Sequence, residues 1–342
     1  MCRKIIHFKV FLILFILILF NTQNSQSEII NFVSLVPGEG QLRDKFISTK
    51  NNIEKKWSKE IEVNLLIDGQ VGTEESMVST VRRGRAQLSL LTVAGTSVTI
   101  PEMGLLMAPY LFDTFEEADF VMDNFLKDRI AQLFDSKGLH FIQWICSGWF
   151  NIFSVKPIKT PEDIKNVRMR ASGGPASRVF LQELNSDVTQ LPFSDLVPSL
   201  QTGLVKGGVT NTPMYRTVGL YELAPFITLT RHGINPGTVF ANKKWFSNLN
   251  YKNKEVIMNG IAPTKKVRQD VREEADEALR YSHNKGATII TLTKNQKNKW
   301  KKITEKSHHK LIEEIGGYSE ELYRLIEDGK IAFKLSQKNK GQ

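Results

Sequence analysis

Short apolar runs alternate along the chain with longer segments in which apolar residues recur every three to four positions. The short runs predict β-strands, and the longer segments predict amphipathic helices. The first cycle joins an apolar run at 29–36, a charged helical segment at 43–59 and a second run at 61–67. Further strands are predicted at 86–91, 139–145, 167–171, 207–210, 237–242 and 287–292. This alternation is typical of an α/β fold.

Polar residues that favour helix starts mark where several of the helices begin. Four threonines precede segments with helical spacing, namely Thr73, Thr114, Thr160 and Thr293. A threonine at this position accepts a backbone hydrogen bond from the first turn, whose amide groups otherwise lack partners. Ser194 is predicted to start a short helix, and one long helix is predicted over residues 254–284.

The N-terminus has the pattern of a secretory signal peptide. Basic residues precede an unbroken run of 11 apolar residues, Val10–Phe20, and a small-x-small triplet follows at Ser25–Ser27. The run is too short to cross a bilayer, which takes about 20 apolar residues. We therefore expect residues 1–27 to be removed on export to the periplasm, so that the remaining chain starts near Glu28. The alternative is an uncleaved membrane anchor.

Two cysteines are present, Cys2 and Cys146, and removal of the N-terminal segment leaves only Cys146. No internal disulfide is then possible, so core packing must hold the exported fold together. Cys146 lies in the apolar segment 141–149, and we expect it to be a small core residue rather than a nucleophile.

The chain carries a basic excess. Its formal net charge of +10 falls to +7 without residues 1–27, because three basic residues and no acidic ones are lost. The remaining excess is spread over lysine-rich helical segments rather than gathered in one patch, so we expect no nucleic-acid partner. A mild positive field still favours anionic solutes.

Motifs for cofactor and metal chemistry are incomplete. The segment PGEGQLR at 37–43 follows a strand, but a dinucleotide-binding loop needs a third glycine where Arg43 stands. His308 and His309 are neighbours, so on a helix they point about 100° apart and cannot chelate one metal ion together. No nucleophile stands near a matching base along the chain. We expect no cofactor, no metal site and no catalytic residues.

The order of elements divides the exported chain into two α/β lobes, since 342 residues are more than one compact core usually holds. We expect lobe one to span 28–152 and to regain residues 238–285, and lobe two to span 153–237. The C-terminal strand and helices at 286–342 are expected to pack across both lobes.

Two arginines stand one residue apart in the segment VRMRASGGP at 167–175, just before a turn and a helix. In a strand, Arg168 and Arg170 share one face. The edge of an α/β sheet where a strand ends and a helix begins commonly binds anionic ligands. This segment is therefore a candidate binding site for an anion.

The region that contains these arginines, 158–208, resembles the solute-binding subunits of tripartite ATP-independent periplasmic (TRAP) transporters of the C4-dicarboxylate-binding, or DctP, type. Four further segments are similar to parts of the same family, at 68–90, 101–123, 228–249 and 271–279. The resemblance implies a two-lobed periplasmic solute-binding protein fold with a hinge and a long C-terminal helix that crosses both lobes. It also implies capture of a small organic acid and its delivery to membrane-embedded permease subunits, without enzyme activity.

The resemblance assigns roles to individual residues. It places the carboxylate-binding arginine at Arg170, an aromatic ligand contact at Phe193 and an amide ligand contact at Asn211. The alternatives are a surface ion pair, a core position and a turn residue, respectively. Two loops of lobe one line the cleft in the family, which makes ligand-binding candidates of Glu39, Gln41, Thr73 and Glu74. Arg168 matches a variable position and is expected to be a solvated or lobe-supporting charge.

The chain departs from the family pattern at one place that bears on the ligand. Many family members have a second arginine after the strand equivalent to 139–145, where this chain has Trp149 and Phe150. One hypothesis is a monocarboxylate with an apolar or aromatic body, held by Arg170 and stacked on Trp149 or Phe150.

Two other functions remain as alternatives from the sequence. One is a periplasmic ligand sensor that presents a bound carboxylate to a receptor kinase. The other is a carboxylate-processing enzyme, for which the sequence lacks a nucleophile and base in proximity. The C-terminal segment 325–342 leaves both a monomer and a homodimer open.

Overall fold

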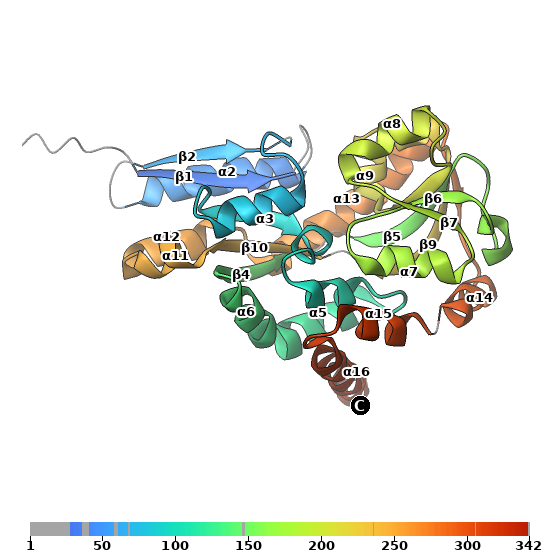
Figure 1. Cartoon of the computed structure of the whole chain (residues 1–342). Helices are drawn as coiled ribbons and strands as arrows, with labels where there is room; N and C mark the ends of the chain where they lie inside the picture. Colours follow the sequence, from blue (N-terminus) through green and yellow to red (C-terminus); the bar gives the residue numbers. More distant parts are fainter. Residues whose placement is uncertain are drawn as a thin grey trace, which may run out of the picture.

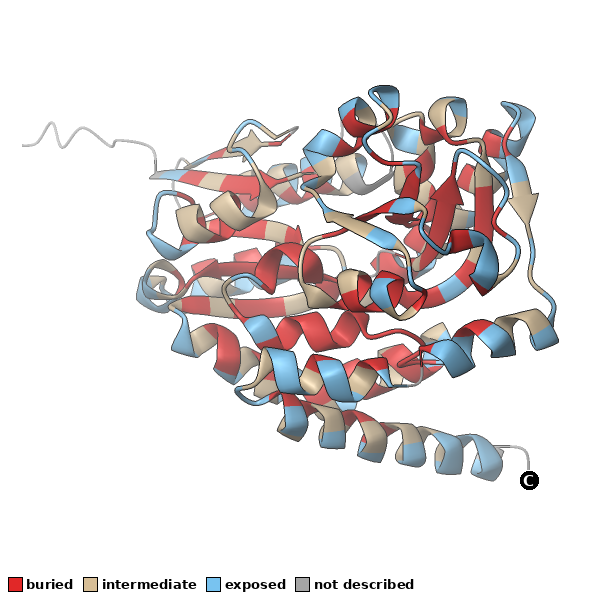
Figure 2. Ribbon diagram, turned by 45° about the vertical axis from the view of Figure 1, so that its right-hand side comes forward, coloured by how far each residue is buried: buried red, intermediate tan, exposed pale blue. Residues whose placement is uncertain are grey.

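The structure, a computed structural model, describes residues 28–35, 41–57, 61–67, 69–145, 148–234, 236–304 and 306–340. Two separate β-sheets, each with helices on both faces, form two lobes (Figure 1). Figure 2 shows that the strands are mostly buried, whereas the outer faces of the surrounding helices are exposed. This arrangement is the predicted α/β class.

Lobe one is built on a five-stranded sheet in the order β2-β1-β3-β10-β4. Its strands are β1 (Glu28–Ser34), β2 (Ile61–Leu66), β3 (Leu88–Thr92), β4 (Leu139–Ile145) and β10 (Gly237–Asn242). The pairs of β1 with β2 and β3 are parallel, whereas β10 is antiparallel to both of its neighbours. The strand that returns late in the sequence therefore lies between two early strands.

Two groups of helices cover the faces of this sheet. On one face α2 (Gln41–Lys56), α11 (Lys243–Asn248) and α12 (Tyr251–Gly260) enclose a core that contains Phe46, Phe246 and Ile257. Six helical segments cover the other face. They are α3 (Glu74–Arg82), α4 (Val93–Thr96), η1 (Pro101–Met107), α5 (Phe115–Val121), η2 (Met122–Leu126) and α6 (Lys127–Ser136). Of these, η1 is a 3₁₀-helix and η2 a π-helix.

Lobe two is built on a six-stranded sheet in the order β11-β9-β5-β8-β6-β7. Its strands are β5 (Trp149–Ser154), β6 (Arg168–Ala171), β7 (Asp187–Gln190), β8 (Gly207–Thr210), β9 (Phe226–Ile234) and β11 (Thr288–Ile290). One face packs on α7 (Pro175–Glu183) and α14 (Lys294–Ile303). The other packs on α8 (Leu196–Gln201), α9 (Thr212–Thr217) and α10 (Leu220–Leu223). Two short 3₁₀ turns, η3 (Pro161–Ile164) and η4 (Phe193–Asp195), complete the lobe.

Within the described residues, three connections join the two sheets, and the C-terminal helices later return to lobe one. The chain crosses from β4 to β5 between Ile145 and Trp149, and it returns from β9 to β10 between Ile234 and Gly237. The third crossing is α13 (Thr264–Asn284), which contacts α2 and β4 in lobe one and α9 and β11 in lobe two (Figure 1). The division that we predicted at residue 152 falls inside β5, all of which pairs within the sheet of lobe two.

The helical segment predicted at 254–284 is two helices rather than one. Helix α12 ends at Gly260, and α13 begins after Pro263, which is the residue before its first turn. Proline lacks an amide hydrogen and disfavours helical conformation in the residue before it, so the chain turns here. The break lets α12 stay on lobe one while α13 crosses to lobe two.

The C-terminal helices fold back onto lobe one. Helix α15 (Ser307–Ile315) contacts both η1 of lobe one and α7 of lobe two. Helix α16 (Ser319–Lys340) packs on α5 and η2, where it buries Leu322 and Ile326. Glycine at 329 allows this approach, because a Cβ there would lie 3.0 Å from Val121 and 3.1 Å from Phe125.

The predicted helix starts are largely confirmed. Thr73, Thr114 and Thr293 each accept a backbone hydrogen bond in the first turn of a helix, and Thr160 precedes the short η3. Ser194 is different, because it lies within η4 and α8 begins two residues later without a side-chain cap. Pro192 precedes this turn and supplies no side-chain cap.

No helix within the described ranges is long and apolar enough to cross a membrane. The predicted signal peptide at 1–27 lies outside those ranges, and so does Cys146.

Candidate functional site: the cleft between the lobes

Arg170 is a buried cation on β6, the second strand from one edge of lobe two's sheet. This strand has β7 on one side and β8 on the other, and only 3% of the surface of Arg170 is exposed. Gly208 of β8 pairs with it, and a Cβ at this glycine would lie 2.9 Å from the Arg170 carbonyl oxygen and 3.1 Å from the Arg170 Cβ. The glycine therefore leaves room for the arginine side chain.

The guanidinium of Arg170 uses only one of its nitrogens within the described part of the chain. Its Nε donates a hydrogen bond to the carbonyl oxygen of Leu191 at 3.0 Å, which fixes the plane of the group. The guanidinium carbon lies 5.8 Å from the centre of the Phe193 ring. The two terminal nitrogens have no hydrogen-bond partner among the described residues, so they remain available as a pair of donors.

Burial and nearby carboxylates act on this cation in opposite directions. Desolvation lowers the pKa of Arg170 to about 10, while Glu74, Glu75 and Asp195 act to raise it. The guanidinium therefore stays protonated at neutral pH. Two of these carboxylates, Glu74 and Glu75, belong to α3 of lobe one, so Arg170 interacts electrostatically with the opposite lobe.

The loop after Arg170 is held by its own hydrogen bonds. Ser172 and Ser177 are joined through their hydroxyl groups at 2.8 Å. Gln190 Nε2 donates to the carbonyl oxygens of Ser172, at 3.3 Å, and Gly174, at 3.0 Å. Gly174 has a φ of +77°, a conformation that favours glycine, and α7 starts directly after it. The sequence Ser-Gly-Gly-Pro thus builds a fixed turn beside the guanidinium.

Lobe one contributes the start of α3, where two of the predicted site residues lie. Thr73 caps the helix by accepting a hydrogen bond from Ser76 N at 3.4 Å. Glu74 accepts hydrogen bonds from the backbone N and the hydroxyl group of Thr92, each at 2.6 Å. Burial raises the pKa of Glu74. These bonds tie α3 to the start of α4, so within the structure Glu74 acts as a brace between two elements of lobe one.

The two lobes meet along a line of glycines next to Arg170. A Cβ at Gly173 would lie 3.4 Å from both the Ala94 carbonyl oxygen and Glu75 Oε1. A Cβ at Gly174 would lie 2.8 Å from Ser97 Oγ, and a Cβ at Gly104 of η1 would lie 3.2 Å from Pro175 Cδ. We call these contacts, Gly173 and Gly174 with Ala94 and Ser97, the glycine seam. It brings lobe one against the loop that follows Arg170.

Asn211 lies at the end of β8 and is buried. Its side-chain oxygen accepts a hydrogen bond from Met214 N at 2.9 Å and so caps α9. Its side-chain nitrogen donates no hydrogen bond to a described residue. The position is close to the first crossing between the lobes, because a Cβ at Gly148 would lie 3.9 Å from the Asn211 Cβ. The Asn211 side chain thus caps α9 with its oxygen, and its Nδ2 remains available as a hydrogen-bond donor.

Trp149 and Phe150 lie at the start of β5, on its two opposite faces. The Trp149 ring stacks on Phe115 of lobe one with centres 4.7 Å apart, and Arg272 lies 4.5 Å above the same Phe115 ring. Phe150 is 5% exposed and packs in the core of lobe one beside His232 of β9. Both side chains therefore pack where the lobes join, and Phe150 has little surface left for a ligand.

The structure thus brings Arg170, Phe193, Thr73 and Glu74 to the facing sides of the lobes. Glu39 lies outside the described residues, and Gln41 starts α2 without a described side chain. Arg168 points to the solvent, pairs with Asp187 at 3.1 Å and bonds the carbonyl oxygen of Leu204, which confirms its expected supporting role. Sequence reasoning missed Glu75, although it directly follows a predicted residue.

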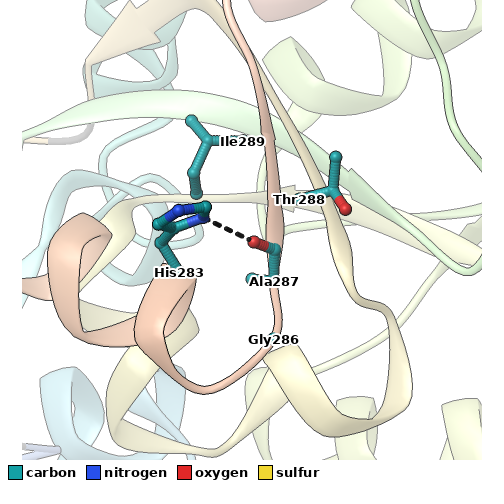
Figure 3. Close-up of a pocket in the computed structure, with 5 residues that line it drawn as sticks. All are labelled: His283, Gly286, Ala287, Thr288 and Ile289. Atoms are coloured by element: carbon teal, nitrogen blue, oxygen red, sulfur yellow. Dashed lines mark hydrogen bonds between the residues drawn. The ribbon is translucent and has the colours of Figure 1, made fainter.

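One cavity, of about 460 Å³, lies away from these residues. It is lined by residues where α13 ends and β11 begins, namely His283, Gly286, Ala287, Thr288 and Ile289 (Figure 3). His283 Nδ1 is hydrogen-bonded to the Ala287 carbonyl oxygen at 3.1 Å. The imidazole of His283 therefore stabilises the turn between α13 and β11 through this hydrogen bond. In the described ranges, His, Cys, Asp and Glu side chains form no group of three that could hold a metal ion.

Comparison with known proteins gives a consistent result over most of the chain. A sequence profile of the bacterial extracellular solute-binding proteins, family 7 (DctP), matches residues 44–315. The ectoine-binding periplasmic protein TeaA of Halomonas elongata is 23% identical over 294 residues, which cover 83% of this chain and 85% of TeaA. The 2,3-diketo-L-gulonate-binding periplasmic protein YiaO of Escherichia coli is 22% identical over 241 residues, which cover 70% of this chain and 74% of YiaO.

Solved structures share the fold. The sugar acid binding protein DctPAm of Advenella mimigardefordensis, in complex with galactonate, has a TM-score of 0.82 at 22% identity and covers 89% of this chain and 99% of its own. A TRAP periplasmic solute binding protein of Shewanella oneidensis with bound succinate has a TM-score of 0.82 at 15% identity, with the same coverage. The predicted two-lobed fold is confirmed by these likenesses.

Proposed function

Because the chain belongs to the bacterial extracellular solute-binding proteins of family 7, we propose that it captures a small organic acid between its lobes. It then delivers this ligand to the membrane-embedded permease subunits of a TRAP transporter. The family consists of binding proteins, so the chain is not an enzyme. The comparisons with known proteins also give no support to a role as a sensor for a receptor kinase.

The observation that carries this proposal is the buried guanidinium of Arg170 with two terminal nitrogens that no described residue occupies. Two parallel N–H donors match the two oxygens of a carboxylate. Each charge-assisted hydrogen bond contributes about 1.5–3 kcal/mol when water is excluded. Phe193, next to the guanidinium, supplies an apolar wall for the carbon skeleton of the ligand.

Closure of the lobes completes the site. The glycine seam brings α3 and α4 of lobe one onto the loop after Arg170, so a ligand bound there is enclosed from both sides. The two strand crossings near Ile145 and Ile234 are the natural hinge, since few residues there must change conformation for the lobes to part. The closed face is the form that we expect the permease to recognise.

The family is extracellular, and for this chain we propose the periplasm. The basic and apolar pattern of residues 1–27 supports export through a cleavable signal peptide. N-terminal sequencing of the protein from a periplasmic extract tests the cleavage near Glu28.

The first prediction concerns Arg170. Replacement by alanine or by lysine is expected to weaken ligand binding at least about tenfold, since lysine cannot offer two parallel donors. Native mass spectrometry of the purified protein identifies the carried acid. Isothermal titration calorimetry then measures its affinity, together with that of galactonate, succinate and ectoine.

Arg168→Lys is the matched control, because Arg168 lies on the same strand with its side chain in solvent. It is expected to bind as the wild type does. Circular dichroism and thermal melting check that each variant folds. A folded Arg170→Ala variant with wild-type affinity for every acid would contradict the proposed function.

A further inference from the structure

Glu75 stands out among the charged groups at the cleft. It is the second residue of α3, its side chain is half-buried, and its carboxylate has no hydrogen bond or ion pair with any described residue. Both carboxylate oxygens of its neighbour Glu74 accept hydrogen bonds from Thr92. Of the two carboxylates, only that of Glu75 is therefore available to a ligand. A carboxylate that no described residue pairs with is available to a cationic group of a ligand.

The position of Glu75 is set by the loop that follows Arg170. Glu75 Oε1 would lie 3.4 Å from a Cβ at Gly173, so the carboxylate reaches across from lobe one to lobe two. Arg170 stands three residues before this glycine. The two opposite charges act on each other, but they do not form an ion pair. A negative and a positive group are thus held apart on facing sides of one cleft.

We infer that the ligand is a zwitterion, whose carboxylate binds the terminal nitrogens of Arg170 and whose cationic nitrogen binds Glu75. This inference rests on the proposed function and specifies its substrate class. A ligand with both charges pairs each of the two groups that the protein leaves without a partner. Phe193 then lies beside the skeleton that joins the two charges.

The other classes of organic acid fit less well. The charged side chains that act on Arg170 are all carboxylates, Glu74, Glu75 and Asp195. A dicarboxylate that placed one end on Arg170 would bring its second end into this negative surrounding, where like charges repel. A polyhydroxylated monocarboxylate would offer Glu75 only neutral donors, and these hydrogen bonds are weaker than one from a cation.

The test compares ligands that differ only at one end. Acids of four, five and six carbons are used in three forms, with an ω-amino, an ω-hydroxyl or an ω-carboxyl group, together with ectoine, galactonate and succinate. Titration calorimetry of the full exported chain is expected to show that the best zwitterion binds at least about tenfold tighter than its two analogues of equal length. Preference for a dicarboxylate or a hydroxy acid, or no binding of any zwitterion, overturns the inference.

Variants at Glu75 assign the preference to this residue. Glu75→Gln is expected to remove the advantage of the ω-amino acid, while the affinity for the ω-hydroxy acid changes by less than about threefold. Glu75→Asp keeps the charge and is expected to restore part of the advantage. Glu116→Gln is the matched control, because Glu116 is the exposed second residue of α5.

The two proposals fail in different ways. If Glu75→Gln leaves the binding of zwitterions unchanged, the inference is wrong, although Arg170 can still bind carboxylates. If Arg170→Ala leaves the binding of every acid unchanged, the proposed function itself is wrong. Thermal melting of each variant shows whether it has folded.

Discussion

A single histidine, His232 of β9, shows how burial of one residue makes the whole fold sensitive to acid. Its ring stacks on Phe180 with centres 3.9 Å apart, and Nδ1 is hydrogen-bonded to the Thr230 hydroxyl group at 2.8 Å. Nε2 is buried without a partner among the described residues. Desolvation lowers the pKa of His232 from 6.5 to about 3, so the folded protein keeps this ring neutral.

The sign of the resulting pH dependence follows from the direction of this shift. The unfolded chain takes up a proton at His232 below pH 6.5, whereas the folded protein does so only near pH 3. Stability contributed by the neutral ring is complete above pH 6.5 and is lost as the pH falls through this window, by up to about 1.4 kcal/mol per unit. His140 and His308, whose pKa values are also lowered by burial, add to the effect.

We therefore predict that His232→Gln flattens the fall in the free energy of unfolding between pH 6.5 and pH 4. Urea unfolding at several pH values measures the slope. The exposed His309→Gln variant is the control and is expected to keep the wild-type slope. An unchanged slope in the His232 variant would show that the ring does not titrate on unfolding as its burial implies.

Individual residues differ in how far the sequence predicted them. Arg170 could be proposed as a ligand-binding residue because a resemblance covered its whole segment, and the structure adds its burial and the two terminal nitrogens that no described residue occupies. Glu75 could not be separated from Glu74 by sequence, because the difference between them is tertiary: Thr92 occupies one carboxylate and not the other. His308 and His309, which are neighbours in the sequence, differ in the same way, since His308 is half-buried against Pro109 and Tyr323 whereas His309 is exposed.

At the scale of elements, the glycine seam decides how closely the lobes approach. Its lobe-two side is the Gly173–Gly174 turn, and its lobe-one side is α4 with Ser97. A β-branched side chain at Gly173 would meet both the Ala94 carbonyl oxygen and Glu75. The side chain would therefore hold the lobes apart without disturbing the core of either lobe.

We predict that Gly173→Val lowers ligand affinity at least about tenfold, because the contacts from lobe one are lost, while the melting temperature changes little. Small-angle X-ray scattering measures closure as a decrease in the radius of gyration when ligand is added. This decrease is expected in the wild type and in the exposed Ser194→Val control, but not in Gly173→Val. If Gly173→Val closes as the wild type does, the glycine seam does not determine how closely the lobes approach.

The elements themselves were predictable where local patterns specify them. The capped helices and the strands at 61–67, 139–145 and 237–242 were found because spacing and end signals agree. Strands β5, β7 and β9 were missed. β5 and β9 carry irregular pairing where they meet, and β7 has only four residues. The division of the long segment at Pro263 was also missed, since each half has helical spacing and only the proline marks the break.

At the scale of the whole molecule, α13 is fastened to lobe one by a network of charges. Arg268 binds both oxygens of Asp123, at 2.6 and 2.9 Å, and its Nε lies 3.0 Å from Asp119. Arg272 also binds Asp119. Further along the helix, Thr212 of lobe two donates a hydrogen bond to the Ala275 carbonyl oxygen at 3.0 Å. The helix is thus fixed in one lobe and reaches into the other.

We predict that Arg268→Met lowers the free energy of unfolding by about 1–3 kcal/mol, because Asp123 loses its buried partner and Asp119 keeps only Arg272. This range allows for the partial exposure of Asp119 and Asp123. Urea unfolding measures the change. Arg280→Met, on an exposed position of the same helix, is expected to lie within about 0.5 kcal/mol of the wild type.

The burial of Arg170 also bears on how the open and closed forms are populated with and without ligand. Closing the two lobes over a guanidinium that has no direct ion pair costs desolvation energy, which nearby carboxylates offset only in part, whereas an anion bound to its terminal nitrogens removes more of that cost. A molecule without cargo is therefore biased towards the open form, and a loaded one towards the closed form. The permease proposed above, which recognises the closed form, would then bind loaded molecules in preference to unloaded ones. Neutralisation of one buried side chain thus couples ligand binding to the shape of the outer surface that the membrane partner contacts.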